Sequence, residues 1–277
     1  MTAAASLEHL ALEVDGAVAT LWLARPQVLN ALSVDLLDEL TGVCEDLRRR
    51  DELRVVVLRG QGRAFSAGAD LAALARLTAT DGSARAAADA GHRAATALES
   101  LPQVTLAAIH GRCVGGGVVL ALACDLRVAV AGTRWSIPEV DLGIPLAWGG
   151  IPRLLREVGP GVARDLVLTC REFGSDEALR AGLVSRVVPD ADLDAEVAAL
   201  AGSLATKARL PVRATLDAVA AVAGQGAVHG WSDADSLLAA LADPESRTAG
   251  ERYLRRLFGD PGPEAVGSEA AREGDDA

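Results

Sequence analysis

The chain has 277 residues, of which 50% are hydrophobic and 23% charged, so it can bury a sizeable core and is not expected to be globally disordered. Its 27 basic and 38 acidic residues give a net charge of −11, which argues against a protein that coats nucleic acid or an anionic membrane. Lys207 is the only lysine and follows Ala-Thr rather than glycine, which excludes nucleotide hydrolysis at a P-loop.

The cysteines and the apolar runs narrow the class of protein further. The four cysteines have no CxxC spacing, so the sequence predicts neither a zinc site nor a disulfide framework. Residues 1–6 lack a basic region followed by an apolar stretch, and apolar runs such as 118–123 are far too short to cross a bilayer. We therefore expect a cytoplasmic protein without a membrane partner and without a metal site.

The first half of the chain predicts strands that alternate with helices. A hairpin is expected over 10–14 and 18–23, because the turn dipeptide Asp15-Gly16 separates two apolar segments. Ser33 can cap a helix that extends to Arg49. The other elements expected here are strands at 54–58, 104–109 and 126–130 and helices at 70–77, 81–100 and 118–123.

The second half predicts a long loop followed by more helical sequence. Glycine and proline are frequent over 132–152, where we expect the loop. Beyond it the sequence predicts helices at 161–169 and 175–181, a strand at 183–188, and helical segments from Leu193 onward, interrupted at Pro211, 224–230 and Pro244. The expected organisation is an α/β core over 1–192, a helical region over 193–259 and an acidic, disordered tail over 260–277.

Two loops of small residues each follow a buried strand and precede a helix. Ala67, Gly68 and Ala69 in the first loop let a ligand approach the backbone closely, and the second loop contains three consecutive glycines, 115–117. If the two loops face one another, their amides form an oxyanion hole for a developing negative charge. Each loop alone is also an ordinary connection between a strand and a helix. The second loop does not match the dinucleotide pattern, because Leu120 stands where the last glycine of GxGxxG would fall.

A series of motifs in consistent order resembles the signatures of the crotonase family, which contains the enoyl-CoA hydratases and isomerases. The resemblance extends from about Leu10 to Phe258. Its motifs are Arg25-Pro26 with Asn30-Ala31, Phe65-Ser-Ala-Gly-Ala-Asp70-Leu71, His110-Gly-Arg-Cys-Val-Gly-Gly-Gly117, Ala123-Cys-Asp125-Leu-Arg, Pro138-Glu139-Val-Asp-Leu-Gly143 and Arg180-Ala-Gly-Leu-Val-Ser-Arg-Val-Val188. The resemblance implies a spiral of ββα units with a C-terminal helical trimerisation region, assembled as a homotrimer or as a hexamer of two trimers.

The same resemblance implies an acyl-CoA thioester as substrate. The backbone N–H groups of Ala69 and Gly116 would form the oxyanion hole and stabilise the thioester enolate. Coenzyme A would enter as part of the substrate, with no permanently bound cofactor. Residues expected to contact the substrate or its CoA moiety are Arg25, Arg63, Ala67, Gly68, Asp70, Leu71, Gly115, Val119, Trp148, Tyr253 and Arg256.

The acidic residues decide which reaction the sequence favours. Hydratases that resemble this chain carry two glutamates that hold and activate water, and here the first position is Val119 while the second, Glu139, is retained. One carboxylate can still move a proton from C2 to C4, so the sequence favours a Δ3-Δ2-enoyl-CoA isomerase with Glu139 as the proton shuttle. An enoyl-CoA hydratase with another water-holding group is the alternative. A protein that binds acyl-CoA without catalysis is an alternative of a different class.

Two further features admit a structural and a functional interpretation. Trp148 lies where the family's loop meets the acyl pocket, so it either limits the length of the acyl chain or packs against the scaffold. Tyr253 and Arg256 resemble positions that reach the adenine and phosphates of CoA, often in a neighbouring subunit, although a charged helical stretch is commonly a solvated face.

Overall fold

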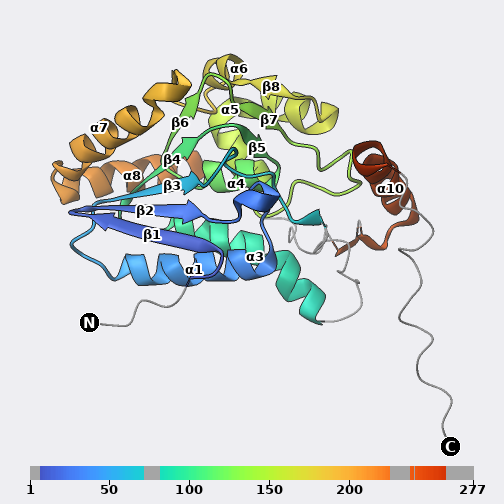
Figure 1. Ribbon diagram of the computed structural model, residues 1–277, viewed down its shortest axis with the longest axis horizontal. Helices are drawn as coiled ribbons and strands as arrows, with labels where there is room; N and C mark the ends of the chain where they lie inside the picture. Colours follow the sequence, from blue (N-terminus) through green and yellow to red (C-terminus); the bar gives the residue numbers. More distant parts are fainter. Residues whose placement is uncertain (1–6, 72–81, 225–237, 240, 260–277) are drawn as a thin grey trace, which may run out of the picture.

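The computed structural model describes residues 7–71, 82–224, 238–239 and 241–259, and its architecture is two sheets surrounded by helices (Figure 1). The larger sheet has six strands in the order β1-β2-β3-β4-β6-β9. Its strands are β1 (Leu10–Asp15), β2 (Val18–Leu23), β3 (Val55–Gly60), β4 (Val104–Ile109), β6 (Leu126–Val130) and β9 (Arg186–Val188). The smaller sheet has the order β5-β7-β8 and consists of β5 (Arg112–Val114), β7 (Arg134–Ser136) and β8 (Phe173–Gly174).

The helices connect the strands and cover the sheets. In chain order they are α1 (Val34–Arg48), α3 (Gly82–Glu99), α4 (Gly116–Leu122), α5 (Gly150–Thr169), α6 (Ser175–Arg180), α7 (Leu193–Ala205), α8 (Arg209–Gly224) and α10 (Pro244–Phe258). Short 3-10 turns occur at Pro26–Val28 and Asp190–Asp192. As predicted, Ser33 caps α1, and its hydroxyl accepts a hydrogen bond from the amide of Leu36.

The strand pairing confirms the predicted α/β class. β1 and β2 form the expected antiparallel hairpin, and Gly16 takes a positive φ of 56° in its turn. From β2 onward every pairing in the larger sheet is parallel, because helical connections return the chain to the same edge. The amino ends of α4 and of the segment after β3 therefore lie at the carboxyl edge of the sheet, where α/β proteins place their ligands.

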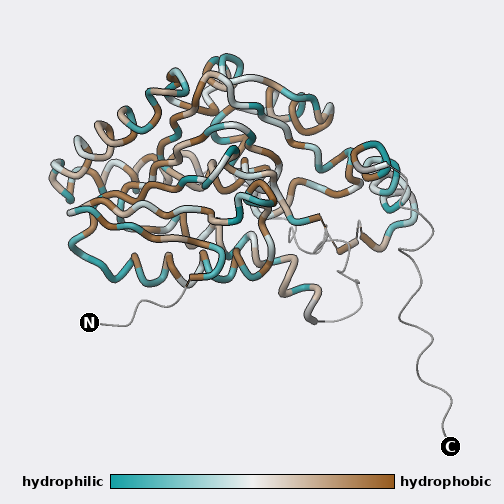
Figure 2. The backbone as a smooth tube through the Cα atoms, viewed as in Figure 1, coloured by the Kyte–Doolittle hydropathy of each residue, from teal (hydrophilic) through white to brown (hydrophobic). Residues whose placement is uncertain are grey.

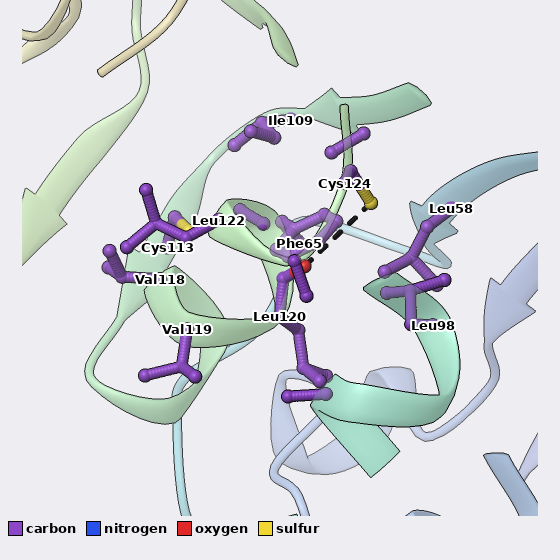
Figure 3. Packing of buried hydrophobic residues seen from close by; sticks show 14 of the residues in the cluster. Leu58, Phe65, Leu98, Ile109, Cys113, Val118, Val119, Leu120, Leu122 and Cys124 are labelled. Atoms are coloured by element: carbon purple, nitrogen blue, oxygen red, sulfur yellow. Dashed lines mark hydrogen bonds between the residues drawn. The ribbon is translucent and has the colours of Figure 1, made fainter. Parts of the chain in front are cut away.

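The central strands are apolar along their whole length because both faces of the sheet are covered. All six residues of β4 are buried: Ala107 and Ile109 belong to one core, and Leu106 and Ala108 to the other. The first core lies against α1, α3 and α4, and the second lies against α7. Figure 2 shows the same pattern, with hydrophobic residues concentrated in the strands and hydrophilic ones along α10. Figure 3 shows how α4 packs into the first core, with Leu120 and Leu122 near Phe65.

The loop predicted over 132–152 is the main correction to the expected elements. Residues 134–136 form β7, which pairs with β5 and buries Trp135, and α5 begins at Gly150 rather than at 161. β7 has only three residues, too few to show an alternating pattern. The helix predicted over 161–169 is the second half of α5, which is broken at Gly159 (φ 72°) before Pro160. Pro211 lies inside the first turn of α8 and does not interrupt it.

Several expectations fall on residues that the structure does not describe. Most of the helix predicted over 70–77, and all of the disordered tail predicted over 260–277, lie outside the described residues. Within the described ranges, no helix combines the length and the apolar character that a transmembrane span needs.

Candidate active site

Five of the predicted site residues surround one small pocket. Ala69, Gly116, Val119, Glu139 and Trp148 line it. The rest of its wall is apolar and comes from the loop Ile144, Pro145, Leu146 and Ala147. The pocket has a volume of about 40 Å³.

The first amide loop is held in place by buried side chains that precede it in the chain. The Asn30 side chain donates to the carbonyls of Gln61 (2.9 Å) and Ala64 (2.8 Å), which fixes the start of the loop. Ser66 Oγ donates to the carbonyl of Asn30 (2.8 Å) and accepts the amide of Gly68 (3.1 Å). Because both polar side chains are buried and fully engaged, the amide of Ala69 is presented in a fixed position.

The second amide loop lies directly against the first. Val114 N–H donates to Ser66 O (3.1 Å), and a Cβ on Gly68 would lie 2.7 Å from Val114 O and 3.6 Å from the amide nitrogen of Gly116. Gly68 also has a positive φ of 89°, so only glycine allows this approach. Within the described part of the chain, the amides of Ala69 and Gly116 donate to no other group. Two adjacent free amides, one at the first residue of α4, can stabilise an oxyanion.

Glu139 supplies the only carboxylate among the described residues that line this pocket. Its side chain is 8% exposed and packs against Gly115, where a Cβ would overlap the carboxylate. Oε2 is buried without a hydrogen-bond partner among the described residues. Burial raises the pKa of Glu139 from 4.5 to about 7, although a hydrogen bond from its own backbone amide lowers it in part. A carboxyl group with a pKa near neutrality can both accept and return a proton.

Val119 occupies the position at which a second acid, the first glutamate of a hydratase, would be expected. It lies on the first turn of α4, is 1% exposed, and lines the pocket with Glu139. A Cβ on Gly150 would lie 2.9 Å from Val119 Cγ2, so the valine also packs tightly against the start of α5. Its methyl groups can neither hold a water molecule nor transfer a proton.

The loop that carries Glu139 is supported from α5. Cys170 lies in the left-handed region (φ 53°) at the end of α5, and its Sγ accepts the amide of Asp141 at 3.3 Å. The carbonyl of Glu139 accepts the amide of Ile144 at 3.0 Å. These contacts fix the segment of the loop that follows the carboxylate.

The predicted CoA residues of α10 lie beside the same loop. Tyr253, Arg252 and Arg256 form a second cavity of about 400 Å³ with Val140 and Asp141. The Arg256 guanidinium lies 5.1 Å from the centre of the Tyr253 ring and 3.4 Å from Asp141 Oδ2. Arg252 and Arg256 outnumber Asp141 in this lining, so the cavity has an excess of positive charge that can attract a phosphate group.

The other residues predicted to contact the substrate or its CoA moiety lie at different positions around the first amide loop. Arg25 pairs with Asp70 at 3.2 Å and donates to the carbonyl of Ala31 at 2.6 Å, so it fixes the far end of the loop. Ala67 donates its amide to Leu29 O. Arg63 is exposed at the start of the loop, and Leu71 is half-buried at its end.

Sequence reasoning missed three residues that shape the pocket. Gly91 on α3 packs against Trp148, Arg153 on α5 binds the backbone of Trp148, and Ser66 orders the first amide loop. Ser66 stood within a quoted motif, but its role depends on the carbonyl of Asn30. The role of Gly91 could not be recognised from the sequence, because one glycine in an alanine-rich helix does not indicate which residue packs against it. No group of three His, Cys, Asp or Glu side chains suited to a metal ion occurs among the described residues.

Comparison with known proteins finds similarity along most of the chain. Residues 13–253 match the model of the enoyl-CoA hydratase/isomerase family. The chain is 36% identical over 214 residues to a short-chain-enoyl-CoA hydratase of Clostridium acetobutylicum, which covers 77% of this chain and 81% of that protein. It is also 36% identical over 207 residues to a crotonyl-CoA hydratase of Syntrophomonas wolfei, covering 74% and 79% of the two proteins.

Solved structures agree with these matches. The crystal structure of an enoyl-CoA hydratase from Bacillus anthracis superposes with a TM-score of 0.74 at 31% identity, covering 91% of this chain and 94% of that one. This similarity confirms the predicted crotonase-type fold. The names of these relatives favour hydration, and none of them supports the isomerase that the sequence favoured.

Proposed function

Since the chain belongs to the enoyl-CoA hydratase/isomerase family, we propose that its pocket binds an enoyl-CoA thioester and transfers protons through Glu139 alone. The observation that carries the proposal is the pairing of one buried carboxyl with two amides that are free among the described residues, in a pocket where Val119 occupies the position expected for a second acid. The thioester carbonyl would accept hydrogen bonds from Ala69 and Gly116, which places C2 of the acyl chain beside the carboxylate.

Isomerisation is the reaction that this arrangement supports best. Ionised Glu139 removes a proton from C2 of a 3-enoyl-CoA, and the electron pair of the broken C–H bond moves into the thioester to give an enolate. Ala69 and Gly116 stabilise the enolate oxygen, and losing one such donor costs roughly 3 kcal/mol of transition-state stabilisation. The enolate then collapses, its C3–C4 double bond shifts to C2–C3, and the protonated Glu139 returns the same proton to C4. No water and no second acid take part.

Hydration is the second candidate, because the relatives named above are hydratases. Water must then be held and deprotonated as it adds to C3, and a proton must be delivered to C2. Glu139 Oε2 has no hydrogen-bond partner among the described residues, so it is available to bind that water. Among the described residues of the lining, no second polar side chain is present to orient it.

The CoA moiety would extend from the pocket towards α10. Tyr253 and Arg256 would contact its adenine and phosphates, and the exposed Arg63 would contact it from the first amide loop. We also propose that the chain assembles as a homotrimer or as a hexamer of two trimers, which size-exclusion chromatography with light scattering tests directly.

Two four-carbon substrates separate the candidate reactions. An isomerase converts vinylacetyl-CoA (3-butenoyl-CoA) into crotonyl-CoA, and a hydratase converts crotonyl-CoA into 3-hydroxybutyryl-CoA. The absorbance of the conjugated thioester appears in the first reaction and disappears in the second. We expect the first to be at least tenfold faster than the second, and the opposite ratio would assign hydration. Tight binding of both thioesters with no turnover of either would indicate a binding protein without catalysis.

A further inference from the structure

Trp148 is the largest side chain in the wall of the pocket, and its backbone takes an unusual conformation. Its φ is 59°, in the left-handed region that a bulky residue seldom adopts. It lies next to Gly116, one of the two oxyanion amides, and packs against the main hydrophobic core. A strained, bulky residue at this position indicates that its side chain is placed there for a purpose.

Two glycines make the space that the indole fills. A Cβ on Gly91 of α3 would overlap Cγ, Cδ2 and Cε2 of Trp148. A Cβ on Gly116 would overlap Cζ3 and lie 3.0 Å from Cε3 and Cη2. The indole therefore bridges α3 and α4, with the edge of its six-membered ring against the oxyanion loop and its pyrrole side against Gly91.

Arg153 fixes the backbone that carries the indole. Its guanidinium is 5% exposed and donates to the carbonyls of Trp148 (2.9 Å) and Gly149 (3.2 Å). The same group pairs with Glu99 of α3 at 2.6 Å, and Arg156 pairs with that carboxylate at 2.7 Å. Burial alone would raise the pKa of Glu99, but the two arginines hold it below its usual value, so this carboxylate stays ionised at neutral pH. The indole is thus a fixed wall rather than a mobile gate.

The space left beside the indole suits a short acyl chain. The pocket's volume of about 40 Å³ is small, since a single buried water needs about 10–15 Å³ of such volume. Behind the indole, α3 presents small residues: Gly91 faces the ring, and Ala88 packs against Ile144 and Ala147.

We propose that Trp148, wedged between Gly91 and Gly116 and held by Arg153, closes the acyl end of the pocket and selects short-chain acyl-CoA thioesters. The proposal rests on the proposed function for the identity of the ligand. It adds the length of the acyl group and the residues that set it. Removing the indole would open the pocket towards the small-residue surface of α3.

Binding of saturated thioesters, which cannot turn over, tests the selection separately from catalysis. Isothermal titration of butyryl-CoA and octanoyl-CoA gives a ratio of dissociation constants for the wild type and for Trp148→Ala. We expect the wild type to prefer butyryl-CoA at least tenfold and Trp148→Ala to shift the ratio at least tenfold towards octanoyl-CoA. Trp148→Phe, which retains a ring, should give an intermediate ratio and serves as the informative variant if Trp148→Ala does not fold.

The outcomes separate this proposal from the proposed function. Equal affinity of the wild type for both thioesters, or an unchanged ratio in both variants, overturns the selection by Trp148 even if enoyl-CoA turnover is found. Selective binding that shifts as expected, without turnover of any enoyl-CoA, supports the selection and overturns the catalytic proposal. Failure of the wild type to bind either thioester overturns both.

Discussion

The two sides of the pocket are built on different principles. The amide side consists of backbone, and its position depends on buried polar groups that are all hydrogen-bonded, among them Asn30 and Ser66. The acid side is one carboxyl, Glu139, whose Oε2 has no partner among the described residues. The side chains of Asn30 and Ser66 are thus already hydrogen-bonded, and among the described residues the N–H groups of Ala69 and Gly116 have no acceptor.

This difference shows how stability and chemistry are divided in the site. Hydrogen bonds on the amide side stabilise the fold and fix a geometry that serves any enolate-forming reaction. The acid side costs stability, because a buried carboxyl with one oxygen left unpartnered among the described residues is unfavourable when ionised, and it determines the reaction. Changes on the acid side should therefore alter activity most, and changes on the amide side should alter stability first.

Replacing Glu139 should cause the largest loss of activity. Glu139→Gln keeps the size of the side chain and removes its acid–base function, so we expect turnover of the enoyl-CoA substrate to fall about 10³-fold. Steady-state assays measure the loss, and titration with butyryl-CoA should show that binding persists. Glu172→Gln, at an exposed carboxylate that pairs with Arg134, is the matched control and should leave turnover unchanged. Full activity in Glu139→Gln would remove this residue from the mechanism.

The pH dependence of the free energy of unfolding should show how much the buried Glu139 carboxyl destabilises the folded protein. The folded protein holds the Glu139 proton up to about pH 7, whereas the unfolded chain releases it near 4.5, so the folded state binds more protons between these values. Glu139 therefore lowers the free energy of unfolding progressively as the pH rises through this window. Relative to wild type, Glu139→Gln should be little changed at pH 5 and more stable at pH 8 by on the order of 3 kcal/mol. Urea unfolding at the two pH values measures the difference, and an equal difference at both would contradict the burial of an ionisable group there.

Catalysis should follow the same ionisation. The base form of Glu139 accumulates above its pKa, so kcat/KM should rise from acidic pH to a plateau above about pH 7. A profile that rises instead near pH 4 to 5 would show that the carboxyl is solvated when the substrate arrives.

Weakening the amide side should lower the free energy of unfolding, with a smaller effect on activity than Glu139→Gln has. Ser66→Ala leaves the carbonyl of Asn30 and the amide of Gly68 without their buried partner, so we expect a loss of about 1–3 kcal/mol in the free energy of unfolding. Turnover should fall as well, because Gly68 precedes the Ala69 amide. Thr215→Ala removes an exposed hydroxyl that bonds Pro211 O and is the control, with a change within about 0.5 kcal/mol. Equal effects of the two substitutions would show that Ser66 does not order the loop.

The sequence predicted the amide side better than the rest of the pocket, for physical reasons. β4 was predicted with its observed bounds because both faces of the sheet are covered, which leaves an unbroken apolar run. The three consecutive glycines 115–117 indicated a close approach of backbone, and the structure places their loop directly against the first amide loop. These signals are local, so one sequence suffices to find them.

The wall of the acyl pocket was not predictable in the same way. Gly91 and Trp148 meet only because the loop before α5 lies against α3, and neither residue carries a local signal of that contact. The raised pKa of Glu139 likewise depends on burial by elements far away in the chain. The resemblance identified the carboxyl, but its ionisation and the shape of the space beside it required the three-dimensional arrangement.

Adding an acid opposite Glu139 should produce a smaller change, and one that tests the choice between the two reactions. Val119→Glu places a second carboxyl at the buried start of α4, where it can hold water against Glu139, and its negative charge raises the pKa of one member of the pair. We expect hydration of crotonyl-CoA to rise about tenfold, equivalent to about 1.4 kcal/mol, while isomerisation of vinylacetyl-CoA falls. Val119→Gln, which has the same shape without the charge, should not gain hydration. If wild-type protein already hydrates crotonyl-CoA as fast as Val119→Glu does, a single carboxyl is enough to activate water in this pocket, and the isomerase interpretation fails.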